Sequence, residues 1–466
     1  MKKLIRKNWL KVILLIALTL TFGTGVFERK TSAQPGSCAD CVADQVIFEL
    51  ASPADLPAVA AQYNLDPTPL GQVGIPTTYR MRVVNGQNPQ TIVTQMTADA
   101  RIKKPQVNRL LSAAERVDLP WTIGRSWSVG RSWSVGGSKK AYDTQWFPAK
   151  IHLNDALAQS TGQGVTVAVL DTGIDLNHPI FANRLVPGHD FVDNDDDPSE
   201  EGVLHQNPSY GHGTHVAGLV ALTAPGAKIM PLRVLDRDGV GDLWRVKDAV
   251  IWAANHGADV INLSFGYPED PLNPDAQRLL KQLLDACDDG LTDDGTTFPE
   301  LGAHRLMAVA GAGNSGELHG PDNAPLRIYP AGQTAGSMIA VAASTRYDLL
   351  ADFSGFDRRW VEVVAPGEDI ISAIPNGRFA SWSGTSMAAP IVSGVAALVK
   401  AKFPDCTPTQ IVHQVKGTGD QWDYDHPTRT DADGRALRIK VRRVDALAAL
   451  TTAVTAGCQM PAPARR

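Results

Sequence analysis

The stretch Val167-Ala-Val-Leu-Asp171-Thr-Gly-Ile-Asp175 decides the fold class. It is a short apolar run that ends in a carboxylate and a glycine turn, a pattern typical of a parallel strand buried on both faces. Similar apolar runs recur along the chain, at residues 165–170, 228–235, 259–264, 305–310 and 338–343. Helical patterns separate these runs. The alternation predicts an α/β fold with a mostly parallel twisted sheet flanked by helices.

Composition places the chain among soluble globular proteins. It has 466 residues, of which 43% are hydrophobic and 20% charged, and its net charge is −5. These values exclude a disordered chain, a collagen-like fibre and a polytopic membrane protein. The mildly acidic balance predicts that nucleic acid is not a partner. We expect a monomer. Its core is expected to be stabilised by apolar burial, because five cysteines are too few for a disulfide scaffold.

The first residues have the features of an export signal. Residues 1–11 contain five basic side chains, the uncharged run 12–27 follows, and Thr31-Ser-Ala33 ends the segment. This pattern predicts a signal peptide over residues 1–33, a secreted protein and no membrane attachment after cleavage. An uncleaved anchor is the alternative, although the run is shorter than the roughly 20 residues that span a bilayer.

A small α+β unit and a linker precede the α/β region. Residues 34–116 contain a buried strand at 46–50, an alternating strand at 78–84 and a strand at 107–111, with helical stretches at 55–64 and 88–96. Residues 117–145 contain the hexapeptide Gly124-Arg-Ser-Trp-Ser-Val129 twice in succession and are rich in glycine and serine. This composition predicts a flexible, protease-accessible linker. Residues 146–466 form the α/β domain.

Two further motifs carry groups suited to catalysis. Gly211-His212-Gly-Thr-His215 places a histidine at a helix start, where the helix dipole favours the neutral imidazole that a general base requires. Ser383-Gly-Thr-Ser386 places a serine beside free backbone N–H groups. Taken singly, the serine could be an N-cap, and the two histidines could bind zinc. The histidine spacing of three, without a glutamate, differs from the usual helical zinc motif.

Taken together, the three motifs resemble those of the subtilisin-like serine proteases (subtilases, peptidase S8). Asp171, His212 and Ser386 occur in the family's chain order, and the resemblance covers about residues 141–457. It implies that Ser386 is the nucleophile and His212 the general base. Asp171 then orients the imidazole and stabilises the imidazolium, and catalysis needs no cofactor.

The resemblance also assigns residues around the triad. It implies that Asn314, in a glycine-rich turn, donates to the oxyanion of the tetrahedral intermediate. It implies that Ser264, Phe265 and Gly266 pair with the main chain of protein and peptide substrates. Main-chain pairing predicts broad specificity with an apolar preference at P1, the substrate residue before the cleaved bond.

Residues 34–116 resemble the ferredoxin-like, inhibitor-type prodomain of exported subtilases. The whole chain is therefore expected to be a zymogen of a secreted serine endopeptidase, with its own prodomain as a partner and a maturation site in residues 117–145. An independent binding domain is the alternative for residues 34–116. A non-catalytic binding protein on a subtilase scaffold and a dedicated processing protease are the alternatives for the whole chain.

The acidic stretch 190–201 holds seven carboxylates, and Asp193, Asp195 and Asp197 have the spacing of a calcium loop. Some subtilases bind Ca²⁺ on a comparable loop, so these three residues are candidate ligands for a structural calcium ion. A solvated loop is the alternative.

Three cysteines fall in the α/β domain. An exported chain meets an oxidising environment, and Cys406 and Cys458 begin and end elements expected to pack together. We expect these two to form a disulfide and Cys287 to stay a buried single thiol. Three free thiols are the alternative.

Overall fold

The computed structural model describes residues 40–113 and 138–458, apart from positions 205, 270–277, 291, 293, 315, 317–326, 334, 358, 431–435 and 455–456. The predicted signal peptide and the tandem hexapeptide lie outside the described residues. Within the described part of the chain, no helix combines the length and the apolar character that a membrane crossing requires.

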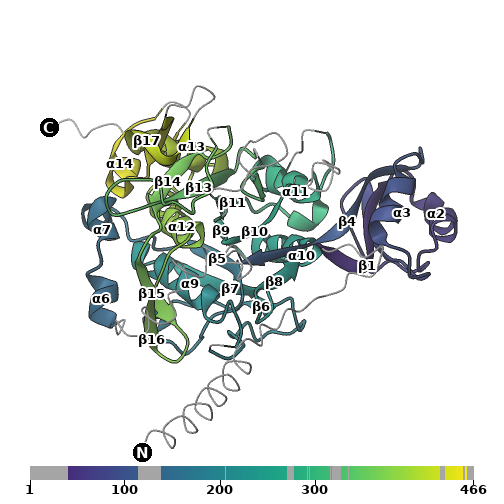
Figure 1. Cartoon of the computed structure of the whole chain (residues 1–466), viewed down its shortest axis with the longest axis horizontal. Coiled ribbons are helices and arrows are strands. Elements are labelled where there is room, and N and C mark those ends of the chain that lie inside the picture. The colour runs from purple at the N-terminus through teal and green to yellow at the C-terminus, as the bar shows by residue number, and fades with distance from the viewer. Residues whose placement is uncertain are drawn as a thin grey trace, which may run out of the picture. The chain divides into compact units, whose positions relative to one another are not determined.

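The apolar runs form a parallel sheet, which confirms the predicted α/β fold (Figure 1). In spatial order its strands are β17 (Asp420–Thr430), β18 (Ala436–Arg443), β14 (Val363–Pro366), β13 (Met338–Ser344), β11 (Met307–Gly311), β9 (Val260–Leu263), β5 (Thr166–Asp171), β7 (Lys228–Arg233) and β6 (His189–Asp190). Neighbouring strands are parallel except at one edge, where β17 runs antiparallel to β18.

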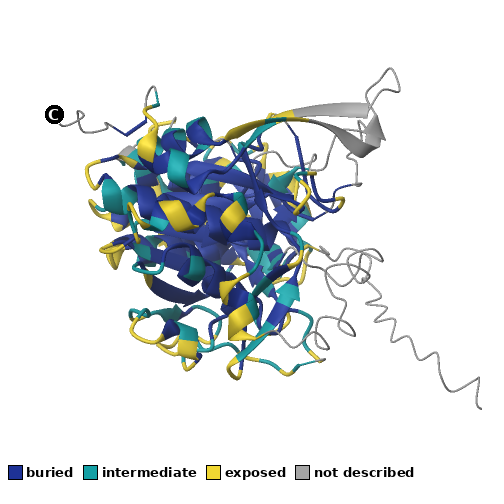
Figure 2. Ribbon diagram, turned by 90° about the vertical axis from the view of Figure 1, so that its left-hand side faces the viewer, coloured by how far each residue is buried: buried dark blue, intermediate teal, exposed yellow. Residues whose placement is uncertain are grey.

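Helices cover both faces of this sheet. Val167 and Val169 of β5 point into a core shared with α9 (His212–Thr223) and α12 (Thr385–Lys402). Ala168 and Leu170, one residue out of phase, point into a second core. That core includes α10 (Leu243–Asn255) and α11 (Arg278–Asp289). Because side chains of a strand alternate between two buried faces, the run must be apolar throughout. Figure 2 shows the central strands and α12 as buried.

The order of the strands determines where functional groups gather. The chain leaves β5 toward β7 on one side and returns to β9 on the other side of β5. Such a reversal opens the sheet at the carboxyl end of the strand, where ligands of α/β proteins usually bind. Asp171 is the last residue of β5 and lies at this point.

Shorter elements complete this part of the chain. They are α6 (Lys139–Asp143), α7 (Phe147–Lys150), α8 (Leu153–Leu157), α13 (Pro408–Thr418), α14 (Ala446–Thr451) and the hairpin of β15 (Ile370–Ile374) with β16 (Arg378–Trp382).

Helix α6 corrects the predicted linker, which extended to residue 145. Tyr142 of α6 is buried and donates to the Gly218 carbonyl at 2.6 Å. Residues 138–145 therefore belong to the packed α/β region.

Residues 40–113 form an N-terminal unit with the predicted ferredoxin-like order. Its elements are β1 (Cys41–Leu50), α2 (Leu56–Gln62), β2 (Gly71–Val73), β3 (Thr77–Arg82), α3 (Pro89–Met96) and β4 (Ile102–Ala113). The strands lie in the order β4-β1-β3-β2 and all pairs are antiparallel. This β-α-β-β-α-β succession is the ferredoxin-like arrangement.

Strand β4 is longer than the predicted strand at 107–111 and leaves its own unit. Its last residues, 110–113, lie between β8 (Val240–Asp242) and β10 (Phe265–Pro268) and are antiparallel to both. On its other side β10 pairs with β12 (Ile328–Tyr329). The sheet of the N-terminal unit is thus continuous with two strands that belong to the α/β region.

The predicted disulfide is present. Cys406 and Cys458 are bonded, with Cα atoms 5.5 Å apart and a sequence separation of 52. Cys287 is a buried free cysteine, and burial raises the pKa of its thiol to about 12, which keeps it protonated and unreactive.

We expect the double variant Cys406→Ser/Cys458→Ser to unfold more easily than the parent by about 4 kcal/mol, because the bridge restricts the entropy of the unfolded chain. Urea unfolding measures this difference in two chains that both carry Ser386→Ala, one with the cysteine substitutions and one without them. An unchanged unfolding midpoint would contradict it, and Cys287→Ser is the control that leaves the bridge intact.

Candidate active site

The predicted acid and base are in contact. His212 is the first residue of α9, and its Nδ1 lies 2.6 Å from Oδ1 of Asp171 at the end of β5. Both side chains are about 1% exposed. Gly213 permits this approach, since a Cβ there would lie 2.1 Å from the Gly173 carbonyl oxygen. The carboxylate accepts the Nδ1 proton, which leaves Nε2 as the nitrogen that can take a proton.

Ser386 lies at the start of the buried helix α12. Its Oγ donates to the main-chain carbonyl of Ser264 at 3.1 Å, and Ser264 Oγ donates to the Ser386 carbonyl at 3.1 Å. These reciprocal bonds fasten the beginning of α12 to the residue that follows β9. During attack the hydroxyl must exchange the Ser264 carbonyl for Nε2 of His212 as its acceptor.

Asn314 is oriented by the residue before the serine. Its Oδ1 accepts from Thr385 N at 2.8 Å and from Thr385 Oγ1 at 3.1 Å. Thr385 Oγ1 in turn accepts from Gly313 N at 3.0 Å. The amide oxygen of Asn314 faces α12, where it accepts both bonds from Thr385. The amide N–H₂ is therefore directed away from Thr385. This is the orientation that a donor to an oxyanion requires.

The predicted substrate strand is paired with β4. Phe265 lies opposite Ala113 and Gly266 opposite Ser112 in antiparallel register. The N–H of Ala113 donates to the Gly239 carbonyl at 2.9 Å, next to β8 on the other side. Ser264 directly precedes this strand. Ser386 is thus bonded to the residue directly before Phe265 and Gly266. Asn314 is bonded to Thr385, which directly precedes Ser386.

His215 does not act with His212 as a metal ligand. Its ring stacks on Trp382 with centroids 4.6 Å apart, and its Nε2 lies 3.2 Å from the Ala380 carbonyl oxygen. Burial lowers the pKa of His215 to about 3, so the ring is neutral. Among the described residues, no group of three or more His, Cys, Asp or Glu side chains could hold a metal ion.

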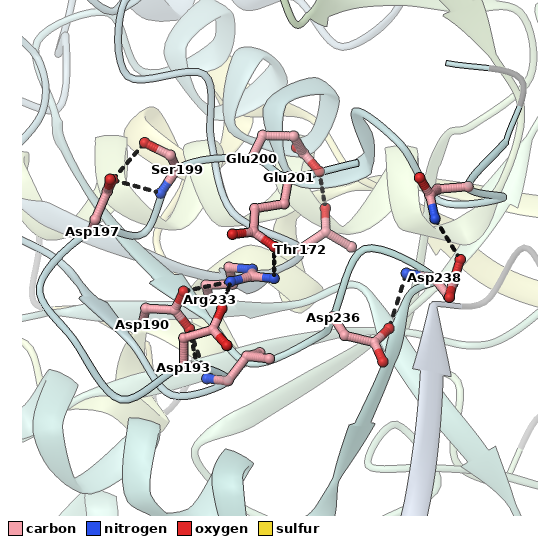
Figure 3. Close-up of polar contacts among 12 residues, drawn as sticks. Thr172, Asp190, Asp193, Asp197, Ser199, Glu200, Glu201, Arg233, Asp236 and Asp238 are labelled. Atoms are coloured by element: carbon pink, nitrogen blue, oxygen red, sulfur yellow. Dashed lines mark hydrogen bonds and ion pairs between the residues drawn. The ribbon is translucent and has the colours of Figure 1, made fainter. Parts of the chain in front are cut away.

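The acidic stretch 190–201 is organised around an arginine (Figure 3). Arg233, the last residue of β7, donates through Nη1 to Asp190 at 2.6 Å and to Asp193 at 2.7 Å. Its Nη2 donates to Glu201 at 2.7 Å. The Arg233 side chain is 2% exposed. A fixed positive charge is thus bonded to three carboxylates of this stretch.

The calcium prediction for Asp193, Asp195 and Asp197 is not supported. Asp193 pairs with Arg233, whereas Asp195 Oδ1 accepts from the N–H of Asp197 at 2.9 Å. Asp197 Oδ1 accepts from the N–H and hydroxyl of Ser199 (Figure 3). Spacing in sequence suggested a common ligand set, but the guanidinium and the loop's own N–H groups engage these carboxylates separately.

Sequence reasoning missed residues that support the site from a distance. Ser393 Oγ donates to Asn262 Oδ1 at 2.9 Å, and Asn262 Nδ2 donates to Ser264 Oγ at 2.9 Å. This chain of bonds joins α12 to β9 behind the nucleophile. The sequence does offer a signal for Ser393 and Asn262, since each is a polar residue inside an apolar run. A buried polar group needs a partner, so such a residue indicates a contact.

Comparisons with known proteins agree with this geometry. The sequence model of the Subtilase family (peptidase S8) matches residues 162–434. A thermophilic serine proteinase of Bacillus sp. (strain AK1) is 36% identical over 285 residues, 58% of this chain and 61% of that protein. Thermitase of Thermoactinomyces vulgaris is 35% identical over 293 residues, 60% of this chain and 91% of that protein.

A solved structure shares the fold. Fervidolysin from Fervidobacterium pennivorans, a keratinolytic enzyme related to subtilisin, matches with a TM-score of 0.63. The match covers 90% of this chain and 62% of fervidolysin, at 22% identity, so it concerns the fold alone. This chain thus spans 61% of the AK1 proteinase and 62% of fervidolysin. The family match covers more than half of the sequence, and from it we conclude that the chain belongs to the subtilase family.

Proposed function

We propose that the chain is the zymogen of a secreted serine endopeptidase that cleaves peptide bonds through an acyl-enzyme. The observation that carries the proposal is the 2.6 Å bond between His212 and Asp171 at the end of β5. Secretion rests on the signal-like residues 1–33.

The proposed reaction follows from these groups. Ser386 Oγ attacks the substrate carbonyl carbon while His212 Nε2 takes the hydroxyl proton. The tetrahedral oxyanion accepts from the Asn314 amide, and Asp171 stabilises the imidazolium. His212 then gives its proton to the leaving amine, which leaves the acyl group on Ser386. Water, deprotonated by the same imidazole, attacks the ester, and the imidazolium returns the proton to Ser386 Oγ as the acid leaves.

Hydrolysis of peptides by the matured chain tests the proposal. We expect a serine-reactive inhibitor to abolish it, because Ser386 Oγ is the proposed nucleophile. Full activity in the presence of such an inhibitor would point to a different mechanism.

The N-terminal unit is proposed to be an inhibitory prodomain. Its strand β4 pairs with β8 and β10 as a substrate main chain would. Two polar contacts anchor it. Lys104 pairs with Asp294 at 2.7 Å, and the Asn108 side chain bonds Asp242 at 3.1 Å. Substrate cannot occupy the same strand position until the unit leaves.

The register also refines the expected maturation site. Ala113 lies opposite Phe265, directly after Ser264, whose carbonyl accepts from Ser386. We propose that the first bond cleaved follows Ala113 within a residue or two, and that residues 117–137 are removed afterward. N-terminal sequencing of the chain during maturation distinguishes this order from a first cut in the predicted linker.

Ile328 is proposed to set the size of the P1 residue. A Cβ at Gly266 would lie 2.5 Å from Ile328 Cγ2, and one at Gly313 would lie 2.6 Å from Ile328 Cγ1. The isoleucine thus packs against the substrate strand and against the glycine that precedes Asn314. It occupies space that a large P1 side chain would need, and the sequence around the proposed cleavage site, Ala113-Ala114, is correspondingly small.

Ile328→Gly should shift P1 preference from alanine toward phenylalanine by about 10- to 100-fold in kcat/KM, the range for gain or loss of apolar contacts in such a site. Paired peptides that differ only at P1 measure the ratio, and Ile328→Val should give a smaller shift. An unchanged ratio in the glycine variant would remove Ile328 from the P1 site.

A further inference from the structure

The carboxyl group of Glu200 is bonded to Thr172, the residue that follows Asp171 (Figure 3). Although the residue is partly exposed, its carboxyl oxygens accept three hydrogen bonds. Oε1 accepts from Thr172 Oγ1 at 2.6 Å. Oε2 accepts from the N–H of Thr214 at 3.0 Å and from its hydroxyl at 2.9 Å. One carboxyl group therefore bridges two segments of the chain.

These segments are the ones that carry the acid and the base. Thr172 follows Asp171 and donates from its N–H to Asp171 Oδ1 at 2.8 Å. Its Oγ1 accepts from the N–H of Gly213, the residue after His212, at 2.9 Å. Asp171 Oδ1 is also the atom that accepts from His212. A displacement of Thr172 would thus change both partners of the Asp171–His212 bond.

We propose that Glu200 is a positioning residue of the catalytic site, which holds the turn after β5 against the first turn of α9 and places a second negative charge near His212. This inference rests on the proposed function, since it assigns to Glu200 an effect on the base that Asp171 orients. Glu200 itself does not contact the reacting atoms.

The charge of Glu200 is expected to change near neutral pH. Withdrawal from water raises the pKa of this carboxyl to about 7, and the nearby Asp171 carboxylate acts in the same direction. Other ionisable residues on the segments that it joins are Asp175, whose N–H donates to Thr214 Oγ1, and His212, two residues before Thr214 on α9. Glu201, the next residue, binds Arg233 at the end of β7.

The ionised form is the one expected to favour catalysis. A carboxylate near His212 stabilises the imidazolium that forms in the transition state, and protonation removes this stabilisation. Activity should therefore fall as the pH drops through about 7, in addition to the loss from protonation of the base itself. A glutamine at position 200 can keep both Thr214 contacts through its amide oxygen, and its N–H₂ can donate to Thr172 Oγ1 in place of accepting from it. It resembles the protonated carboxyl because it has no charge.

The test compares pH profiles of kcat for matured wild type, Glu200→Gln and Glu200→Ala, each normalised to the concentration of titratable active sites. We expect Glu200→Gln to be about tenfold slower than wild type above pH 8, the effect of one pKa unit on the base. The two should converge below pH 6, where wild-type Glu200 is protonated. Glu200→Ala should be slower at every pH, with kcat lowered more than KM is raised.

The matched control is Glu201→Gln. This neighbouring carboxylate binds Arg233 instead of the two threonines, so its loss should leave the shape of the profile unchanged. Parallel profiles of wild type and Glu200→Gln at every pH would overturn the proposal, as would an equal effect of Glu201→Gln. In that case the proposed role of Glu200 is wrong, but the proposed function still holds if wild-type activity depends on Ser386.

A measurement without turnover checks the same charge. In the full-length Ser386→Ala chain, which cannot digest itself, Glu200 binds a proton more tightly when folded than when unfolded. The folded state should therefore lose stability relative to the Glu200→Gln version as pH rises from about 4.5 to about 7. A stability difference that does not change over this interval would contradict the assigned ionisation, whether or not the chain is a protease.

Discussion

Ser386→Ala is expected to abolish peptide hydrolysis and to leave the precursor uncut when it is produced alone in a purified system. The alanine removes the Oγ that now donates to the Ser264 carbonyl and that must attack the substrate. We expect kcat to fall by about 10⁶-fold, the size of the loss when the nucleophile is removed from subtilisin, a member of the same family. Peptide hydrolysis and the mass of the recovered chain measure the two effects.

Ser383→Ala is the matched control for this experiment. Ser383 lies three residues earlier, and its Oγ accepts from the N–H of Asp369 at 2.9 Å, outside the catalytic contacts. Its loss should leave activity within about threefold of wild type, as expected for a substitution away from the reacting groups. If Ser386→Ala still matures by itself, the chain does not process itself through this serine.

Asn314→Ala should lower kcat by about 10²- to 10³-fold with little change in KM, as the loss of the corresponding donor does in subtilisin. The amide N–H₂ acts on charge that exists in the transition state, whereas the ground-state carbonyl carries little. Thr385 fixes the amide through its N–H and its hydroxyl, so the donor is oriented before substrate arrives. Steady-state kinetics on one peptide separate kcat from KM.

Thr385→Val provides a graded comparison. It removes the hydroxyl contact to Asn314 Oδ1 but keeps the main-chain one, so kcat should fall less than in Asn314→Ala. A raised KM with unchanged kcat in Asn314→Ala would assign this residue to binding of the substrate.

The main features of the fold were predictable because burial on both faces leaves a simple pattern. The interior positions of β5 and β13 are all apolar, and a glycine turn follows β5 at the edge where the site lies. The catalytic residues were predictable because their neighbours in sequence also shape the backbone. Gly213, for example, is required by the approach of α9 to the Gly173 carbonyl.

The remaining features depend on partners that are distant in sequence. Arg233 lies 40 residues beyond Asp193, and its guanidinium binds that carboxylate, a contact that the spacing within the acidic stretch does not indicate. Glu200 reaches the site through hydroxyl and N–H groups of two threonines, which no motif marks. The contact of Ile328 with two glycines arises from pairing of β12 with β10, again across a long separation.

The extent of β4 could not be predicted for a related reason. Its last four residues pair with β8 and β10 and leave their own unit, so their extended form depends on strands over 120 residues away. The local pattern predicted a strand at 107–111, which overlaps the end of the part paired with β1 and the start of the part paired with β8, but misses residues 102–106.

Labelling of the matured protein with a serine-reactive phosphonate tests the central claim most directly. The account predicts one label per molecule, located on Ser386 by peptide mass analysis and slowed by a competing peptide substrate. His212→Ala should label far more slowly, because the base that deprotonates Oγ is gone. A folded, matured chain that takes up no phosphonate at Ser386, or that labels equally well without His212, would contradict the account.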